Sequence, residues 1–343
     1  MQADGVEPIV ILGAGITGLS CARALAERGL RAVILDRARG VGGRCATRRI
    51  GPDGGQAVDF GVSFLHGRNP DFLASIAEVE ATRLDGWPNE IHGVGHPCQP
   101  QAFSPLEARI AFAEGISVFP KHLARGLEVR PDTRVVSASL ERDAIELTIE
   151  GTAPVRARTV ALALATEQTS KLLESLGAKL RELDAARALL GIVRSQPALT
   201  MIAAYAESVP RPPWHITYPE ESRIIQLIAH DSSKREDPRL TVFVIQAHAR
   251  WSREHIDDPG WANTLLAEAT RLLGPWAATP TLTQEHRWRF ARVDMGTELT
   301  GPLLIHLPGG ARLGLAGELF APGGGVEAAW LSGRELARRI SEE

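Results

Sequence analysis

Lysine, tyrosine and cysteine are scarce in this chain of 343 residues. Its 38 basic residues comprise only four lysines and 34 arginines, and it has only two tyrosines and three cysteines. Cys21, Cys45 and Cys98 are too few and too scattered to form a disulfide framework or a cysteine metal site. We therefore expect a reducing compartment and no bound metal.

Long apolar runs and a large excess of charge are also missing. No apolar run approaches the roughly 18 residues that a membrane-spanning helix needs, and the N-terminal residues lack the basic and apolar regions of a signal peptide. The net charge of −3 offers no broad basic surface for nucleic acid. We expect a globular cytoplasmic protein that binds neither nucleic acid nor membranes, and its length predicts two domains.

The most informative pattern lies near the N-terminus. An apolar run at residues 9–12 leads into a G-x-G-x-x-G motif at residues 13–18. A helix is predicted over about 16–28, and a second buried strand over 32–35 ends at Asp36, 18 residues after the last glycine. A strand, a glycine turn, a helix and a strand-end acid in this order predict a dinucleotide-binding unit.

Each residue type in this motif has a physical role. Gly13 allows a tight turn, Gly15 lets the backbone approach a pyrophosphate, and Gly18 lets the helix pack closely on the strand. The helix N-terminus directs N–H groups and partial positive charge at the phosphates. Asp36 is placed to accept hydrogen bonds from a ribose hydroxyl.

A second glycine motif follows at Gly42-Gly43-Arg44. The glycine pair permits another close backbone approach, and the guanidinium of Arg44 suits bidentate phosphate binding. A solvated basic loop is the alternative interpretation, because Arg37 and Arg39 are close by.

The C-terminal region contains a related pattern. A predicted strand over 313–316 ends at Gly317-Glu318, and three glycines at 323–325 open a helix that continues to Ile340. Taken alone, the triple glycine is more typical of a flexible loop. Together with the N-terminal unit, it predicts the second half of one nucleotide site.

The chain resembles bacterial renalase-like proteins of the flavin amine oxidase superfamily, whose members carry a Gly-Gly-Arg motif. The resemblance covers most of the chain in pieces and is weakest over Glu78 to Ser117 and Arg194 to Asp258. The similar segments are Leu35 to Arg49, Asp59-Phe60-Gly61, Lys121 to Leu127, His286 to Ala291 and Gly325 to Gly333.

The resemblance implies an α/β fold in which a Rossmann-like FAD-binding domain of the amine oxidase type is interleaved with a mixed α+β substrate domain. We expect the FAD-binding domain to comprise residues 1–75, 118–165 and 285–343. Residues 76–117 and 166–284 are then expected to form the substrate domain.

The cofactor implied by the resemblance is FAD, bound without a covalent link. In such proteins the strand-end acid reaches the ribityl or phosphate region, and the last helix directs its N-terminus at the flavin N1–C2=O edge, where it stabilises the reduced flavin. The expected cofactor-binding residues are Gly13, Gly15, Ile16, Thr17, Gly18, Asp36, Arg37, Gly43, Arg44, Val135, Gly317, Glu318, Gly325 and Val326.

The activity implied by the resemblance is oxidation of dihydronicotinamide isomers of NAD(P)H, with hydride accepted at flavin N5 and O2 reduced to H2O2. No general base is needed, because the pyridinium product is aromatic. The expected catalytic residues are His66, His286 and Trp288. His286 and Trp288 are two residues apart, so on a strand they share a face; burial in a domain core is the alternative.

A flavin-dependent amine oxidase is the main alternative. Phe64 to Gly67 is similar to the Ile-His-Gly segment of polyamine oxidases, so His66 either faces the substrate or caps a turn. Against this alternative, Gly325 stands where many amine oxidases have a cage aromatic, and the chain has so few lysines that the lysine-held water molecule of many amine oxidases has no good candidate, Lys234 included. A third possibility is an FAD-binding dehydrogenase or a flavoprotein without oxidase activity.

Overall fold

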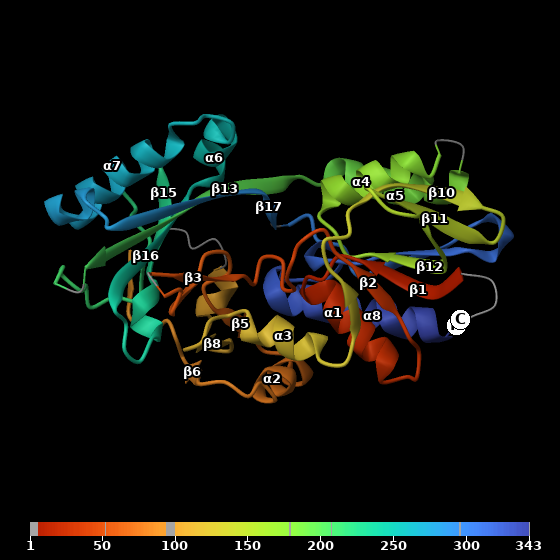
Figure 1. The fold of residues 1–343 in the computed structure, drawn as a ribbon, viewed down its shortest axis with the longest axis horizontal. Coiled ribbons are helices and arrows are strands. Elements are labelled where there is room, and N and C mark those ends of the chain that lie inside the picture. Colours follow the sequence, from red (N-terminus) through yellow and green to blue (C-terminus); the bar gives the residue numbers. More distant parts are fainter. Residues whose placement is uncertain are drawn as a thin grey trace. The chain divides into compact units, whose positions relative to one another are not determined.

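The computed structural model of the protein describes residues 6–51, 53–93, 100–177, 180–206, 208–294 and 296–342, so Cys98 lies outside the described residues. The chain forms two compact units, each assembled from separated stretches of sequence (Figure 1). Unit 1 comprises Met1–Gly43, Phe119–Ser195 and Val293–Glu343. Unit 2 comprises Arg44–Val118 and Gln196–Arg292.

An eight-stranded sheet forms the centre of unit 1. Its strands are β1 (Val6–Leu12), β2 (Val33–Leu35), β9 (Glu128–Arg130), β10 (Val135–Glu141), β11 (Ala144–Ile149), β12 (Val155–Leu162), β18 (Leu303–His306) and β19 (Arg312–Leu315). The strands β9, β2, β1, β12 and β19 are parallel neighbours in that order. An antiparallel extension, β10 and β11, continues from β12, and β18 pairs antiparallel with β19. Residues 9–12 and 33–35 are continuously buried, which is typical of parallel strands covered on both faces.

Helices cover both faces of this sheet (Figure 1). On one face, α1 (Ile16–Ala26) and α8 (Gly325–Glu342) pack against each other. On the other, α4 (Thr166–Ser175) and α5 (Asp184–Ile192) bury leucines in one core with β1, β2 and β12. The short helix α3 (Val118–Ala124) leads into β9, and its Leu123 carbonyl accepts a hydrogen bond from Arg23 Nη2 at 2.8 Å.

Unit 2 is built on a six-stranded sheet with the order β17-β13-β16-β15-β14-β7. These strands are β7 (Ile91–His92), β13 (Ser195–Ala206), β14 (Ile216–Thr217), β15 (Ile225–His230), β16 (Leu240–Ala247) and β17 (Leu282–Val293). One face is covered by α6 (Ala249–His255) and α7 (Trp261–Leu273), which contribute Trp251, Trp261 and Leu265 to its core. Alternate residues of the same strands point into a second core on the opposite face.

Unit 2 also contains two smaller sheets and a further α-helix. The hairpin β3 (Thr47–Ile50) and β4 (Gln56–Asp59) supplies Ile50 and Val58 to the second core. The other small sheet has the order β5-β8-β6, with β5 (Leu65–Gly67), β6 (Arg83–Asp85) and β8 (Ala108–Phe112). Asn69 caps α2 (Pro70–Ala77) by accepting hydrogen bonds from the backbone N–H groups of Asp71 and Phe72.

The predicted fold class is confirmed: a Rossmann-like α/β unit is interleaved with a mixed α+β unit. The chain nevertheless passes from one compact unit to the other at residues that differ from the domain bounds we expected. Residues 44–75 lie in unit 2, because β4 contacts β16 and β5 pairs with β8. Residues 166–195 lie in unit 1, because Leu172, Leu173 and Leu190 join the core under the parallel sheet.

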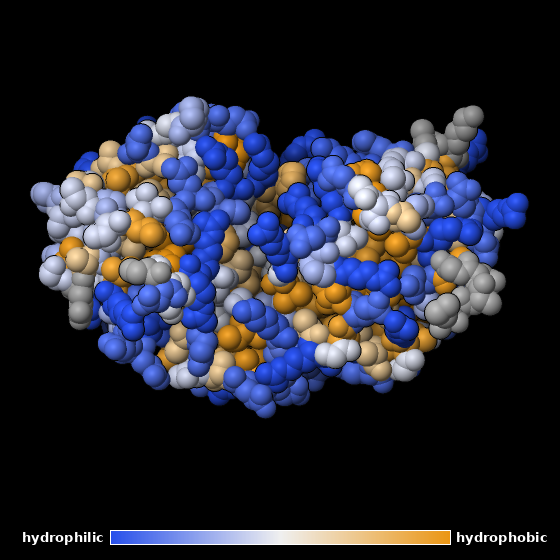
Figure 2. Space-filling view, viewed as in Figure 1, coloured by the Kyte–Doolittle hydropathy of each residue, from blue (hydrophilic) through white to orange (hydrophobic). Residues whose placement is uncertain are grey.

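The surface of the protein is mainly hydrophilic on the face viewed in Figure 2, with smaller hydrophobic patches among the polar residues. Among the described residues, the only large hydrophobic side chains that are exposed are Leu106, Val136 and Ile192. No helix within the described ranges has the length and apolar character needed to span a membrane.

A glycine allows the close contact between α1 and α8. A Cβ atom on Gly333 would lie 2.1 Å from Ser20 Oγ and 2.3 Å from the Thr17 carbonyl oxygen. We predict that Gly333→Ala lowers the free energy of unfolding by about 2 kcal/mol, because the two helices must move apart. Gly191→Ala in α5 is the control: a Cβ there meets nothing within 4 Å, so the unfolding free energy should stay equal or rise. Denaturant titration of both variants measures the difference, and equal stabilities would contradict the explanation.

Candidate functional site

In unit 1, several loops leave the parallel sheet at the same edge. Leu12 at the end of β1 is in register with Leu35 of β2 and with Leu162 of β12, which is in turn in register with Leu315 of β19. The loops that follow these strands therefore start side by side. In open α/β sheets, ligands bind outside the carboxyl ends of parallel strands, so this edge is the candidate site of unit 1.

The turn between β1 and α1 depends on two glycines. Gly13 has φ +104°, and its N–H group donates to the Leu35 carbonyl at 2.9 Å. A Cβ on Gly13 would lie 2.5 Å from the Ala163 carbonyl oxygen, and one on Gly18 would lie 1.9 Å from the Gly13 carbonyl oxygen. Side chains are therefore excluded at both positions, and α1 begins directly against the strand.

Gly15 faces open space. A Cβ atom built on Gly15 meets nothing within 4 Å, although the backbone there has an ordinary φ of −76°. Gly15 also supplies no side-chain cap to α1, so Ile16 and Thr17 begin the helix with backbone N–H groups directed outward. An uncapped helix N-terminus beside open space is suited to an anionic group.

The second glycine motif lies against the first. Gly42 N donates to the Ala14 carbonyl at 2.8 Å, and Gly42 forms a bridge with Gly15. A Cβ on Gly43, whose φ is +55°, would lie 3.5 Å from Gly15 Cα. These contacts bring together two motifs that the sequence predicted separately.

The side chain of Asp36 is tied to the same turn. Its Oδ2 accepts from Ala14 N at 2.5 Å and its Oδ1 from Ala38 N at 2.7 Å, which leaves the half-buried carboxylate beside the glycine turn. The next residue, Arg37, is exposed. The Asp36 carbonyl accepts from Thr133 N at 2.8 Å, so the loop before Val135 and β10 is held next to this acid.

The C-terminal motif reaches the same edge of the sheet. Gly317 N donates to Ser332 Oγ at 3.1 Å, and Glu318 Oε1 accepts from Val293 N at 3.1 Å. The helix α8 begins at Gly325, which has φ +75°, and Val326 follows in its first turn. Unit 1 therefore brings two helix N-termini opened by glycine, the Asp36 carboxylate and the open space at Gly15 to one edge of its sheet.

Arg44 lies in unit 2, where its Nη1 donates to the Ala291 carbonyl at 2.9 Å. The phosphate contact expected for Arg44 is not tested by this structure and stays a prediction.

An aromatic group in unit 2 contains two of the three expected catalytic residues. The rings of His286 and Trp288, both on β17, have centroids 4.1 Å apart. Phe60 stacks on Trp288 at 5.2 Å and meets His286 edge-on at 5.1 Å. Arg48 lies over the Phe60 ring at 4.2 Å. We call these four residues, Arg48, Phe60, His286 and Trp288, the β17 aromatic group.

Within this group, His286 is neutral. Burial and the adjacent Arg48 guanidinium lower the pKa of His286 to about 4. Because Arg48 Nη2 lies 3.1 Å from His286 Nδ1 and can only donate, Nδ1 is the acceptor and Nε2 carries the proton. His286 is therefore a hydrogen-bond donor at Nε2 and not a base.

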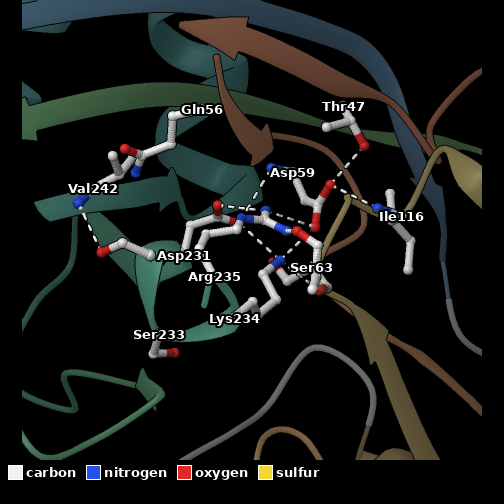
Figure 3. A network of polar contacts seen from close by, with 12 residues as sticks. Thr47, Gln56, Asp59, Ser63, Ile116, Asp231, Ser233, Lys234, Arg235 and Val242 are labelled. Carbon is white, nitrogen blue, oxygen red and sulfur yellow. Dashed lines mark hydrogen bonds and ion pairs between the residues drawn. The ribbon is translucent and has the colours of Figure 1, made fainter. Parts of the chain in front are cut away.

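A buried ionic cluster lies near the end of β4 (Figure 3). It consists of Asp59, Asp231, Lys234 and Arg235, whose side chains are at most 6% exposed. Lys234 Nζ lies 2.5 Å from Asp59 Oδ2 and 2.7 Å from Asp231 Oδ1, and it donates to the Ser63 carbonyl at 3.0 Å. Its three N–H groups are thus engaged, so Lys234 is not available to hold a reactive water molecule.

The charges in this Asp59 cluster stabilise one another. Burial by itself raises the pKa of Asp59, but the charges of Lys234 and Arg235 and hydrogen bonds from Lys234 and Thr47 outweigh it and hold the pKa below its usual value. Burial likewise lowers the pKa of Arg235, and the two aspartates reverse this effect and raise it. Two positive and two negative side chains therefore balance one another in the interior of unit 2.

The cluster also fixes the segment that carries Phe60. Asp59 Oδ1 accepts from Thr47 Oγ1 at 2.7 Å and from Ile116 N at 2.8 Å. One residue later, the Phe60 carbonyl accepts from Trp288 Nε1 at 3.3 Å. The position of the β17 aromatic group therefore depends on the Asp59 cluster.

His66, the third expected catalytic residue, lies on β5. Its Nδ1 is 3.1 Å from Glu107 Oε2, and both side chains are buried. Sequence reasoning missed Glu107, because the two residues are 41 positions apart and no short motif links them. It also missed Arg48 and Asp231. The i, i+3 and i+4 spacing of Asp231, Lys234 and Arg235 indicates local ion pairs but gives no sign of burial.

Unit 2 also has a cavity of about 390 Å³ lined by charged side chains that include Arg49, Glu114, Arg235 and Arg239. None of the expected catalytic residues lines it.

Two family models match the chain. The model for an NAD(P)-binding Rossmann-like domain matches residues 11–79, and the model for flavin containing amine oxidoreductases matches residues 99–341, well over half of the chain. A curated relative, lysine-specific histone demethylase 1 homolog 1 of Arabidopsis thaliana, is 44% identical over 78 residues. That match covers 22% of this chain and only 9% of the relative.

Solved structures with the same fold cover nearly the whole chain at low identity. Putrescine oxidase bound to putrescine has a TM-score of 0.72 at 15% identity, over 98% of this chain and 99% of its own. A putative protoporphyrinogen oxidase from Exiguobacterium sp. 255-15 has a TM-score of 0.73 at 13% identity, and the match covers 100% of this chain and 99% of that one. Cyclohexylamine oxidase from Brevibacterium oxydans IH-35A has a TM-score of 0.69 at 13% identity, and the match covers 98% of this chain and 99% of that one.

The Asp59 cluster generates a stability prediction. Lys234→Met leaves two buried aspartates with one cation, so we expect the free energy of unfolding to fall by about 3–5 kcal/mol. Lys234→Met with Asp231→Asn restores the charge balance and should recover much of this loss. Arg239→Met, which breaks the exposed pair with Asp53, is the control and should change stability by less than about 0.5 kcal/mol. A double variant no more stable than Lys234→Met would contradict charge balance as the cause.

Proposed function

The chain belongs to the flavin containing amine oxidoreductase family, and from this premise we propose that it oxidises a dihydronicotinamide nucleotide. The protein is a flavin-dependent oxidoreductase, and its cofactor is FAD. In the proposed reaction, hydride leaves an isomer of NAD(P)H for flavin N5, and O2 is then reduced to H2O2. Such a renalase-like activity acts on a small molecule and requires no metal.

Unit 1 is proposed to hold FAD without a covalent link. The N-terminus of α1, with Gly13, Gly15 and Gly43, binds the pyrophosphate, and Asp36 binds the adenosine ribose. Val135 contributes backbone contacts to adenine, and Arg37 and Arg44 add positive charge at the phosphates. When bound, FAD supplies the hydride acceptor and the route of electrons to O2.

At the other end of the proposed site, Glu318 and Gly317 bind the ribityl region, and Gly325 and Val326 open a helix that stabilises negative charge on the flavin ring. These assignments are supported by the common sheet edge of the loops that carry them.

Unit 2 is proposed to supply the groups that contact the substrate. The observation that supports a dihydronicotinamide is the β17 aromatic group, where Phe60 and Trp288 stack and His286 offers a neutral N–H donor. Stacked aromatic rings suit a flat ring such as nicotinamide. Oxidation to an aromatic pyridinium needs no base, which fits a lysine whose three donors are all engaged in ion pairs and a carbonyl contact.

A flavin-dependent amine oxidase is the second candidate, and one observation favours it. The buried pair of His66 and Glu107 offers polar groups that could receive an amine. Two of the solved structures with this fold are named as putrescine oxidase and cyclohexylamine oxidase. A dehydrogenase, or a flavoprotein that does not react with O2, differs only in the electron acceptor.

We propose that the protein works in the cytoplasm. Cys21 fits a reducing environment without taking part in the chemistry, because burial raises the pKa of its thiol to about 12 and keeps it protonated.

Anaerobic reduction of the purified, FAD-loaded protein tests the function. We predict that the visible flavin absorbance bleaches on addition of 2- or 6-dihydronicotinamide nucleotides and returns when air is admitted, with formation of H2O2. Putrescine, cyclohexylamine and benzylamine should leave the spectrum unchanged. Bleaching by amines alone would contradict the proposed substrate, and slow reoxidation in air would contradict an oxidase.

A further inference from the structure

The pair formed by His66 and Glu107 is built into the small sheet of unit 2. His66 lies on β5, which pairs with β8, and Glu107 immediately precedes β8. His66 Nδ1 is 3.1 Å from Glu107 Oε2, and the two side chains are only 8% and 9% exposed. This strand pairing therefore holds an imidazole and a carboxylate together away from bulk solvent.

The contact with Glu107 determines which ring nitrogen of His66 carries the proton. A carboxylate only accepts hydrogen bonds, so Nδ1 must be the donor in the contact with Glu107. In the tautomer with a single proton at Nδ1, Nε2 presents its lone pair. Within the described residues, Nε2 is buried and has no hydrogen-bond partner. An acceptor left unsatisfied in the interior is unfavourable, which makes it a place where a ligand N–H would be stabilised.

An aromatic ring and an arginine lie beside His66. The Phe64 ring centroid lies 6.2 Å from that of His66, and Phe64 itself contacts Trp87 and Phe103, each at 6.1 Å. Arg109 is the cross-strand partner of His66, but its Nε donates to the Pro88 carbonyl at 3.0 Å and its Nη1 to the Ala102 carbonyl at 3.3 Å. Its guanidinium is thus engaged with backbone carbonyls.

A second glutamate near the same strand shows what a purely structural carboxylate does there. Glu114, two residues after β8, accepts from the backbone N–H of Thr82 with both oxygens at 3.0 Å and so fixes the start of β6. Glu107 instead contacts Nδ1 of His66, whose other ring nitrogen, Nε2, has no hydrogen-bond partner within the described residues. This difference makes Glu114 a matched control for Glu107.

We propose that Glu107 is a positioning residue that holds His66 so that Nε2 accepts a hydrogen bond from a substrate N–H group. The inference rests on the proposed function, in which that group is the carboxamide NH2 of the dihydronicotinamide. His66 carries no proton away in this role, and Glu107 acts only through His66. The pair therefore selects the substrate and does not perform the hydride transfer.

The test compares two substrates of the FAD-loaded enzyme, of which only one has the N–H donor, and it compares their ratio between variants so that intrinsic differences between the two rings cancel. One is a dihydronicotinamide nucleotide, and the other is its 3-acetyl analogue, in which a methyl group replaces the amide NH2. Because the 3-acetyl analogue lacks one hydrogen bond, we expect the wild type to prefer the carboxamide by about tenfold in kcat/KM. Because the hydrogen bond is present before and during hydride transfer, the preference should lie mainly in KM.

Four variants then test which residues cause the preference. His66→Leu and Glu107→Leu should each reduce it to about twofold or less, with KM for the carboxamide rising about tenfold and kcat changing little. Glu107→Gln keeps a possible acceptor for Nδ1–H and should retain part of the preference. Glu114→Gln should keep the full wild-type preference. FAD content and melting temperature are recorded for every variant, so that loss of the fold is not mistaken for loss of the contact.

An undiminished preference in folded, FAD-loaded Glu107→Leu would overturn the proposal, and so would an equal loss in Glu114→Gln. If Glu107→Leu does not fold, Glu107→Gln decides, and a preference unchanged from the wild type overturns the proposal. If only amines reduce the wild-type flavin, the proposed function fails instead. The pair is then judged on that amine: a rise in KM in Glu107→Leu but not in Glu114→Gln supports it, and equal KM values overturn it.

Discussion

The absence of side chains at Gly13 and Gly18 is the constraint on which the rest of unit 1 depends. With a Cβ at either position, the backbone turn between β1 and α1 could not close, because contacts of 2.5 and 1.9 Å to carbonyl oxygens would result. With the turn closed, α1 starts at the sheet edge where β2 delivers Asp36 and β19 delivers Gly317. The convergence of these loops at one sheet edge therefore depends on the tight turn between β1 and α1.

Unit 2 depends on charge balance. Asp59, Asp231, Lys234 and Arg235 are stable in the interior only as a set, and the segment that begins at Asp59 carries Phe60 into contact with Trp288. The two histidines of the proposed substrate site are oriented by neighbours of opposite charge. Arg48 makes Nδ1 of His286 an acceptor, whereas Glu107 makes Nδ1 of His66 a donor, so the two rings offer opposite hydrogen-bonding character to a ligand.

The sequence predicts the glycine turn of unit 1 far better than the contacts that orient the side chains of unit 2. The turn from Gly13 to Gly18 and its contact with Asp36 are local, because Ala14 and Asp36 are only 22 positions apart, so their spacing can be recognised in the sequence. Glu107 meets His66 only through the pairing of β5 with β8, and Asp59 meets Lys234 across 175 positions, so no local pattern signals either contact. The domain bounds differ for the same reason: strand pairing and helix packing, not sequence order, assign residues 44–75 and 166–195 to their units.

The affinity of Gly15→Ala for FAD tests the central claim, that the space beside Gly15 belongs to the cofactor. In the protein alone, a Cβ at Gly15 meets nothing within 4 Å and φ is −76°, so the variant's melting temperature without cofactor should equal that of the wild type. Gly40→Ala, at an exposed glycine that also has open space, is the control. We predict that Gly15→Ala weakens FAD binding at least tenfold, roughly 1.4 kcal/mol, while Gly40→Ala does not. Wild-type FAD affinity in a folded Gly15→Ala protein would contradict the account.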